Sequence, residues 1–212
     1  FPSAVGSLQA QIRPLDIVIP DQFIDRTHQR PITFFSEGVV AHVSLADPFC
    51  PILSRIIAEE GAKLIPEGRK IHIGGTYLAM EGPAFSTRAE SELYRSWGCS
   101  VIGMTNHTEA RLAREAEIAY TSLSMATDYD CWHPENESVN VEMVIDNLKS
   151  NADLGAKIVK ATAKKISCLR PKSLAHDALK DGLMTAKDRV KNKIRAKIDI
   201  FTKKYWGPFD QK

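Results

Sequence analysis

The chain has 212 residues, of which 43% are hydrophobic and 25% charged, and its formal net charge is +2. This composition suits one globular domain with a sizeable core and excludes a disordered or fibrous protein. No apolar stretch approaches the ~20 residues that span a bilayer, and the first residues lack the basic-then-apolar pattern of a signal peptide, so we expect a cytoplasmic protein without a membrane partner.

Charge is distributed unevenly along the chain. Residues 1–156 carry 12 Lys and Arg against 21 Asp and Glu, whereas residues 157–212 carry 16 against 5. A basic end can bind nucleic acid, but aromatic residues are few here and no recognition motif accompanies it. Docking on an acidic surface, its own or a partner's, accounts for the charge equally well, and we do not expect nucleic acid as a partner.

The cysteines are scattered and form no C-x-x-C pair; they are Cys50, Cys99, Cys131 and Cys168. This spacing indicates reduced, mostly buried thiols better than a disulfide framework or a zinc site. We therefore expect no metal.

The first part of the chain predicts short strands around one helix. DIVIP (16–20) predicts a buried strand, and VVAHVSLADP (39–48) predicts a second. Residues 51–62 have helical spacing of their apolar side chains, with Gly61 at the end. RKIHIGGTYLAM (69–80) is β-like, and its glycine pair favours a bulge or a close backbone approach.

Strands and helices alternate in the rest of the chain. Thr87 and Glu90 are spaced as a capping box, and Gly98 is placed to end the helix that they begin. The pattern then predicts a strand, a helix, a strand, a long helix and a tail helix over residues 99–104, 109–118, 119–128, 141–166 and 187–204. This alternation predicts an α/β fold with a largely parallel or mixed sheet.

Three loops that follow predicted strands are expected to meet at one rim of the sheet, where open α/β folds usually bind ligands. These loops are residues 80–86, 104–108 and 128–134. The rim would gather hydroxyl and carboxylate side chains from separate parts of the chain, namely Ser86, Met104, Thr105, Asp128 and Asp130.

The most informative stretch of the rim is ATDYDCWHP (126–134). If it is extended, alternation places Asp128 and Asp130 on one face and Tyr129 on the other. Two neighbouring carboxylates repel, so one of them should keep its proton and donate a hydrogen bond while the other accepts one. A donor beside an acceptor matches the N7 and 6-amino edge of adenine.

The same residues also have purely structural interpretations, between which the spacing does not decide. Asp128 could cap the following turn while Asp130 faces solvent. Ser86 could be a helix cap, and His42 could be a satisfied core histidine. The other candidates could be ordinary core or loop residues: Phe85, Met104, Val139, Val141, Val144, Thr105 and Ser3.

Five segments taken together resemble the purine nucleoside phosphorylase superfamily and, within it, the 5′-methylthioadenosine phosphorylases. They are DQFIDRT (21–27), TYLAMEGPAFSTRAESELYRSWG (76–98), GMTN (103–106), EARLAREAEIAY (109–120) and ATDYDCW (126–132). The resemblance runs from about Gly6 to about Ile166. It implies an α/β fold with a central mixed sheet surrounded by helices, usually assembled as a homotrimer with sites at the subunit borders.

The resemblance also implies a role for each matching position. Asp128 would meet the purine N7 and Asp130 the exocyclic amino group, with Tyr129 between them in the substrate site. The base and ribose would further contact Phe85, Ser86 and the backbone of Met104. The methylthio group would lie among Val139, Val141 and Val144, with His42 reaching in from a neighbouring subunit, and phosphate would bind Ser3, Ala4 and Thr105.

The implied activity is phosphorolysis of 5′-methylthioadenosine to adenine and 5-methylthioribose 1-phosphate in methionine and purine salvage. Inorganic phosphate is the co-substrate, no cofactor is implied, and the nucleus is a second compartment for such enzymes. The pair of carboxylates argues against 6-oxopurines, because relatives that cleave inosine or guanosine generally place an asparagine in this region.

One departure from the family concerns the start of the chain. The family opens with a strand, a glycine-rich turn and an Arg-His pair that clamps phosphate, and none of these precedes Phe1. We therefore expect an N-terminally incomplete phosphorylase domain over residues 1–170 and a basic helical tail over 171–212. The alternative function is that of a truncated, inactive homologue that keeps the purine pocket for binding or oligomerisation.

Overall fold

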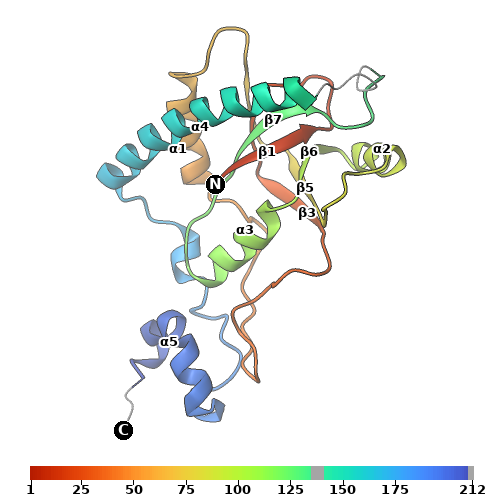
Figure 1. Ribbon diagram of the computed structural model, residues 1–212. Helices are drawn as coiled ribbons and strands as arrows, with labels where there is room; N and C mark the ends of the chain where they lie inside the picture. Colours follow the sequence, from red (N-terminus) through yellow and green to blue (C-terminus); the bar gives the residue numbers. More distant parts are fainter. Residues whose placement is uncertain (135–140, 210–212) are drawn as a thin grey trace.

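A computed structural model describes residues 1–134 and 141–209, with the backbone alone for 141–144. In this part of the chain seven strands form one mixed sheet in the order β3-β5-β6-β1-β7-β2-β4 (Figure 1). The strands are β1 (Pro2–Ser7), β2 (Ile17–Ile19), β3 (Gln22–Arg26), β4 (Ile71–Ile73), β5 (Thr76–Met80), β6 (Cys99–Gly103) and β7 (Leu123–Tyr129). The predicted α/β fold with a mixed sheet is confirmed.

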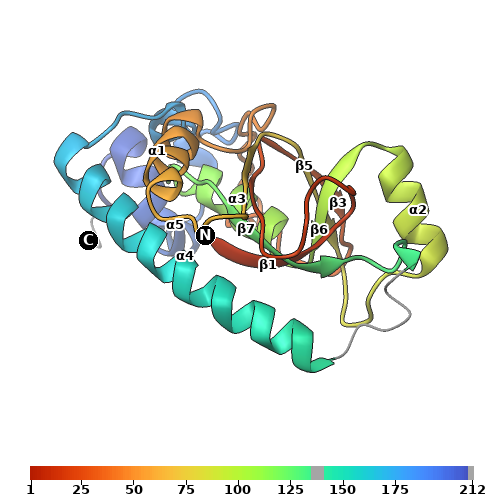
Figure 2. The same ribbon diagram turned by 90° about the horizontal axis from the view of Figure 1, so that it is seen from above.

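Five α-helices accompany the sheet within the described residues. They are α1 (Pro51–Ala62), α2 (Arg88–Ser96), α3 (Asn106–Glu115), α4 (Val141–Leu169) and α5 (Asn192–Trp206). The predicted capping box begins α2, because the Thr87 hydroxyl accepts from the Glu90 N–H and the Glu90 carboxylate accepts from the Thr87 N–H. α4 packs on both α1 and β7 and runs along the sheet (Figure 2).

The short strand β2 shows how the sheet divides the core into layers. Ile17 and Ile19 point to the side of α1 and α4, where they pack with Ile158, whereas Val18 points to the opposite side, where it packs with Val5. All these side chains are buried. A strand buried on both faces needs a continuous apolar run, which the predicted strand DIVIP provides.

Strand direction contradicts the expectation of one shared rim. β5 and β6 are parallel to each other, but β1 is antiparallel to β6 and parallel to β7. The loops that follow β6 and β7 therefore leave opposite ends of the sheet. The loop after β5 nevertheless contacts the other two, because Ser86 donates to Asp130 at 2.8 Å and Gly82 lies against Met104. The loops therefore meet across β1 and not through parallel strand ends.

Several predicted boundaries are wrong. Residues 39–48 form no strand but a single bridge between Ala41 and Leu183, because this segment supplies side chains to a separate apolar cluster. α3 begins at Asn106 instead of 109, and β7 begins at Leu123 instead of 119. Strands β1 and β3 were not predicted.

The separate apolar cluster joins the tail to the rest of the chain. Its buried members come from residues 35–39 and from the tail, and α5 contributes Ile194 and Ile198 on one stripe, as predicted. α5 lies away from the sheet, beside the loop that leaves β3 (Figure 1). The division of the chain at residue 170 remains a prediction.

The packing of α4 generates a stability prediction. Ile158 is fully buried between α4, α1 and the sheet, whereas its neighbour Val159 is 43% exposed. We expect Ile158→Ala to lower the free energy of unfolding by about 2–5 kcal/mol, and the control Val159→Ala to change it by less than about 0.5 kcal/mol. Urea denaturation measures the free energy of unfolding of both variants. An equal decrease in the two variants would contradict this packing.

Candidate functional site

Strand β1 is the element that brings the candidate residues together. On one side it pairs with β7, where Ser3 faces Ser124 and Gly6 faces Asp128. On the other side it pairs with β6, antiparallel, with Gly6 opposite Ile102. β6 then runs toward the N-terminal end of β1 and leads into the loop of Met104 and Thr105. One end of β1 thus lies near hydroxyl groups and the other end near carboxylates.

A bulge in the β1–β7 ladder sets the position of the first carboxylate. Val5 pairs with Ala126 but Gly6 pairs with Asp128, so Thr127 is the extra residue. Its hydroxyl lies 3.3 Å from the Val5 carbonyl oxygen and 2.6 Å from Asp128 Oδ1, to which it donates. Bulges near active sites commonly re-aim a side chain, and this one aims Asp128.

The environment of the two carboxylates differs. Burial raises the pKa of Asp128, the hydrogen bond from Thr127 lowers it, and the charge of Asp130 raises it further. Asp130 is 9% exposed and accepts at Oδ2 from the Ser86 hydroxyl at 2.8 Å, with the Cys131 thiol 3.9 Å from the same oxygen. Asp128 therefore holds its proton more tightly than an ordinary aspartate, while donors surround Asp130 as an acceptor.

The structure excludes one of the simple structural interpretations. Ser86 is not the cap of α2, since Thr87 occupies that place and the Ser86 hydroxyl donates to Asp130. The hydroxyl of Tyr129, which lies between the two aspartates in the sequence, donates a hydrogen bond to the Ala10 carbonyl at 3.2 Å.

The loop before Ser86 presents an aromatic ring to solvent. The Phe85 side chain is 84% exposed. The same loop approaches Met104 closely, because a Cβ on Gly82 would lie 2.7 Å from the Met104 sulfur. The loops that follow β5 and β6 therefore touch at this point, near the expected position of a ribose.

Sequence reasoning missed the residue that ties these two loops together. Arg30 donates to the Met104 carbonyl at 2.8 Å and to the Glu81 carbonyl at 2.6 Å, and its Nε lies 3.1 Å from Glu81 Oε1. The pKa of Glu81 is lowered to about 2, chiefly because its carboxylate accepts a hydrogen bond from the His28 N–H and also one from Arg30. No local pattern in DRTHQRP predicts this contact, because it depends on the tertiary arrangement.

The hydroxyl end of β1 contains a second missed residue. Ser3 Oγ lies 3.3 Å from the hydroxyl of Tyr77, which comes from β5 and is fully buried. Thr105 stands at the N-cap of α3 without a side-chain capping bond. Burial raises the pKa of Tyr77, whereas the nearby Ser3 and Thr105 lower it. Ala4, beside Ser3, is exposed.

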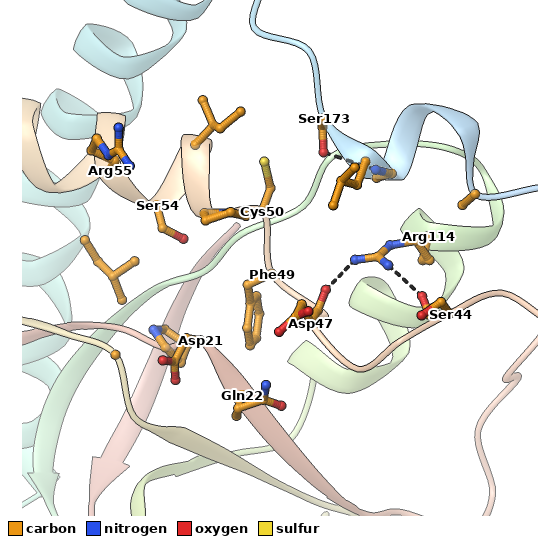
Figure 3. Close-up of a pocket in the computed structure, with 18 of the residues that line it drawn as sticks. Asp21, Gln22, Ser44, Asp47, Phe49, Cys50, Ser54, Arg55, Arg114 and Ser173 are labelled. Carbon is orange, nitrogen blue, oxygen red and sulfur yellow. Dashed lines mark hydrogen bonds between the residues drawn. The ribbon is translucent and has the colours of Figure 1, made fainter.

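His42 lies apart from the other candidates. Its N–H donates to the Gly182 carbonyl at 2.7 Å, and the residue lines a cavity of about 1270 Å³. None of the other predicted site residues whose side chains are described lines this cavity. In this cavity Arg114, from α3, reaches the segment of Ser44 and Asp47 and donates to both carbonyls (Figure 3). The interpretation of His42 as a core histidine is wrong, because the residue is exposed.

The three valines predicted to surround a methylthio group cannot be placed as side chains. Val139 lies outside the described residues, and Val141 and Val144 belong to the first turn of α4, of which only the backbone is described. Within residues 1–134 and 145–209, no group of three His, Cys, Asp or Glu side chains could hold a metal ion. The helices of the same ranges include none that is long and apolar enough to cross a membrane.

Sequence comparison connects this geometry to known proteins. The family model described as the phosphorylase superfamily matches residues 2–164. A protein of Prochlorococcus marinus named S-methyl-5′-thioadenosine phosphorylase is 71% identical over 210 residues, which cover 99% of this chain and 67% of that protein. A protein of Thermosynechococcus vestitus with the same name is 54% identical over 203 residues, covering 96% of this chain and 70% of that protein.

Solved structures that resemble this chain carry the same enzyme name. A methylthioadenosine phosphorylase from an antarctic soil metagenomic library superposes with a TM-score of 0.90 at 46% identity, over 94% of this chain and 70% of that chain. A methylthioadenosine phosphorylase of Schistosoma mansoni in complex with tubercidin superposes with a TM-score of 0.71 at 31% identity, over 79% of this chain and 64% of that chain. The chain thus spans roughly two thirds of the length of such relatives.

The raised pKa of Asp128 predicts a pH-dependent cost to stability. The folded state holds the proton more tightly than the unfolded state. The penalty is therefore absent below the ordinary aspartate pKa of about 4, grows as pH rises above it, and is fully present above the folded pKa. We expect Asp128→Asn to have a higher Tm than wild type at pH 8, with the difference shrinking as pH falls toward 4.

Calorimetric scans across this pH range measure the difference. Asp153→Asn is the matched control, because Asp153 is exposed on α4, and its Tm should follow that of wild type at each pH. A constant Tm difference for Asp128→Asn at all pH values would contradict a buried carboxylate that is costly to ionise.

Proposed function

The chain belongs to the phosphorylase superfamily and, within it, to the S-methyl-5′-thioadenosine phosphorylases, and from this membership we propose that it splits 5′-methylthioadenosine with inorganic phosphate. The products are adenine and 5-methylthioribose 1-phosphate, so the protein is a pentosyltransferase of purine and methionine salvage. The observation that carries the proposal is the asymmetric pair Asp128 and Asp130.

The reaction exchanges one bond at C1′ of the ribose for another. A phosphate oxygen forms a bond to C1′ while the bond from C1′ to N9 breaks, and the electron pair of that bond moves into the purine ring. Adenine leaves readily only if N7 receives a proton or a strong hydrogen bond. Asp128, whose pKa is raised by burial, is the acid that supplies it, a role typically worth ~10²–10⁴-fold in rate.

The second carboxylate reads the base. Asp130 Oδ2 accepts from the Ser86 hydroxyl at 2.8 Å, and carboxylate oxygens can accept further hydrogen bonds. It can therefore accept from the 6-amino group of adenine. The oxygen of a 6-oxopurine would face the same carboxylate with lone pairs against lone pairs, so we expect 6-aminopurines to bind in preference to 6-oxopurines.

The remaining contacts follow from the family. Phe85 would lie against the base, and the Met104 backbone would contact the ribose hydroxyls. Ser3, Ala4 and Thr105 would hold phosphate, and no cofactor other than this co-substrate is needed. Val139, Val141 and Val144 would enclose the methylthio group, since they closely follow the carboxylates along the chain.

We further propose a homotrimer that acts in the cytoplasm and, in organisms that have one, the nucleus. What supports the oligomer is the position of His42, which lines a cavity apart from Asp128, Asp130 and the other predicted site residues whose side chains are described. If His42 contacts the methylthio group, it must come from a neighbouring subunit.

One assay tests the reaction. The protein is incubated with 5′-methylthioadenosine, and adenine release is followed with and without phosphate. We expect release that depends on phosphate and yields 5-methylthioribose 1-phosphate. Adenine binding without turnover would contradict the proposal and favour an inactive purine-binding homologue, whereas release without phosphate would indicate hydrolysis.

Substitution of the acid gives a second prediction. Asp128→Asn keeps the size of the side chain but cannot transfer a proton, so we expect kcat to fall by about 10²–10⁴-fold. The Asp153→Asn control should keep the wild-type rate. Unchanged kcat in Asp128→Asn would show that another group protonates the base.

A further inference from the structure

Tyr77 lies near two hydroxyl groups on separate elements. It starts on β5, yet its hydroxyl lies 3.3 Å from Ser3 Oγ on β1. Thr105, just after β6, is near enough to oppose the rise in the pKa of Tyr77 that burial causes. β6 lies between β5 and β1 in the sheet, so the ring must cross β6 to reach β1. It crosses at Gly103, where any Cβ would collide with the Tyr77 hydroxyl.

Hydrogen-bond counting shows what this hydroxyl can do. Each of the three hydroxyls has one proton to donate and lone pairs that accept. To bind an anion, Ser3 and Thr105 must point their protons at it, so neither proton is then available for Tyr77. Tyr77 must in that state act as the donor, and its proton can satisfy a lone pair on one of the two.

The surroundings keep Tyr77 in the donor form. Burial is the largest effect on this group and raises the pKa of Tyr77, so its hydroxyl stays protonated at neutral pH. The side chain is fully buried and packs with Val5, Ala79 and Val101. A ring held in this way has little freedom to turn its hydroxyl elsewhere.

We propose that Tyr77 is a positioning residue for the phosphate site: its hydroxyl donates to Ser3 Oγ and so orients the Ser3 hydroxyl with its proton toward the anion. This inference rests on the proposed function, in which Ser3 and Thr105 hold phosphate. Tyr77 itself acts through Ser3 and needs no contact with the substrate.

Tyr77→Phe removes the hydroxyl and leaves the ring in its packed position. We expect the KM for phosphate to rise about 5- to 10-fold, the effect of one lost hydrogen bond, while the KM for 5′-methylthioadenosine and kcat stay within about twofold of wild type. Tyr94→Phe is the control, because Tyr94 is also buried but packs on Trp97. It should leave both KM values unchanged.

A double-mutant cycle tests whether Tyr77 acts through Ser3. Ser3→Ala should itself raise the KM for phosphate, and adding Tyr77→Phe to it should raise the KM less than Tyr77→Phe does alone, because the partner is already missing. Additive effects, or an equal rise in the KM of both substrates, would overturn the proposal.

Thermal unfolding provides a readout that does not depend on turnover. Phosphate should raise the Tm of wild type, since a ligand stabilises the state that binds it, and should raise the Tm of Tyr77→Phe less. If phosphate raises the Tm of Tyr77→Phe as much as that of wild type, the proposed role of Tyr77 is overturned while the proposed function still stands. If wild type itself releases no adenine with phosphate, the proposed function fails instead.

Discussion

The double pairing of β1 is the constraint on which the site depends. β1 is antiparallel to β6 and parallel to β7, with a bulge between Val5 and Gly6. Since side chains alternate along a strand, a shift of one residue on either side would turn the facing side chains to the other face. A Cβ on Gly6 would lie 3.1 Å from Ile102 and 3.5 Å from Asp130, so glycine permits the close approach that the register requires.

The carboxylates at the end of β7 show a conflict between stability and chemistry. A buried carboxyl group favours its neutral form, and the ionised form of a neighbour strengthens this preference. Thr127 donates to Asp128 and Ser86 donates to Asp130, so each group has a partner, yet the pair still costs stability at neutral pH. Active sites often retain such costs because the chemistry needs them.

Local patterns in the sequence predicted local structure well. The capping box at Thr87 and the apolar stripe of α5 depend on neighbouring residues, and both are present. The glycine pair 74–75 makes the predicted close approach, since a Cβ on Gly75 would collide with Ser100 Oγ. Both glycines have positive φ values of 85° and 106°, which explains why these two positions need this residue type.

Features that depend on distant contacts were not predictable in the same way. In β1, Ser3 and Val5 are buried and alternate with the exposed residues Pro2 and Ala4. An alternation of this length is too short to predict a strand from the sequence. The predicted pairing of Asp128 with Asp130 came from adjacency in the sequence. The contacts of Asp130 with Ser86, of Ser3 with Tyr77 and of Arg30 with Met104 join residues 44 or more positions apart, and no single segment contains their signal.

The basic tail illustrates how charge composition can mislead about partners. Lys204 pairs with Glu117 at 3.0 Å and with Asp177 at 2.8 Å, and Lys197 pairs with Glu37 at 2.8 Å. Solvent screens such exposed pairs, so they contribute little stability. The apolar stripe of α5 therefore supplies most of the docking energy, and the charges set its orientation. Because Glu117 follows α3, whose first residue follows Thr105, the tail braces the helix that begins at the hydroxyl end of the site.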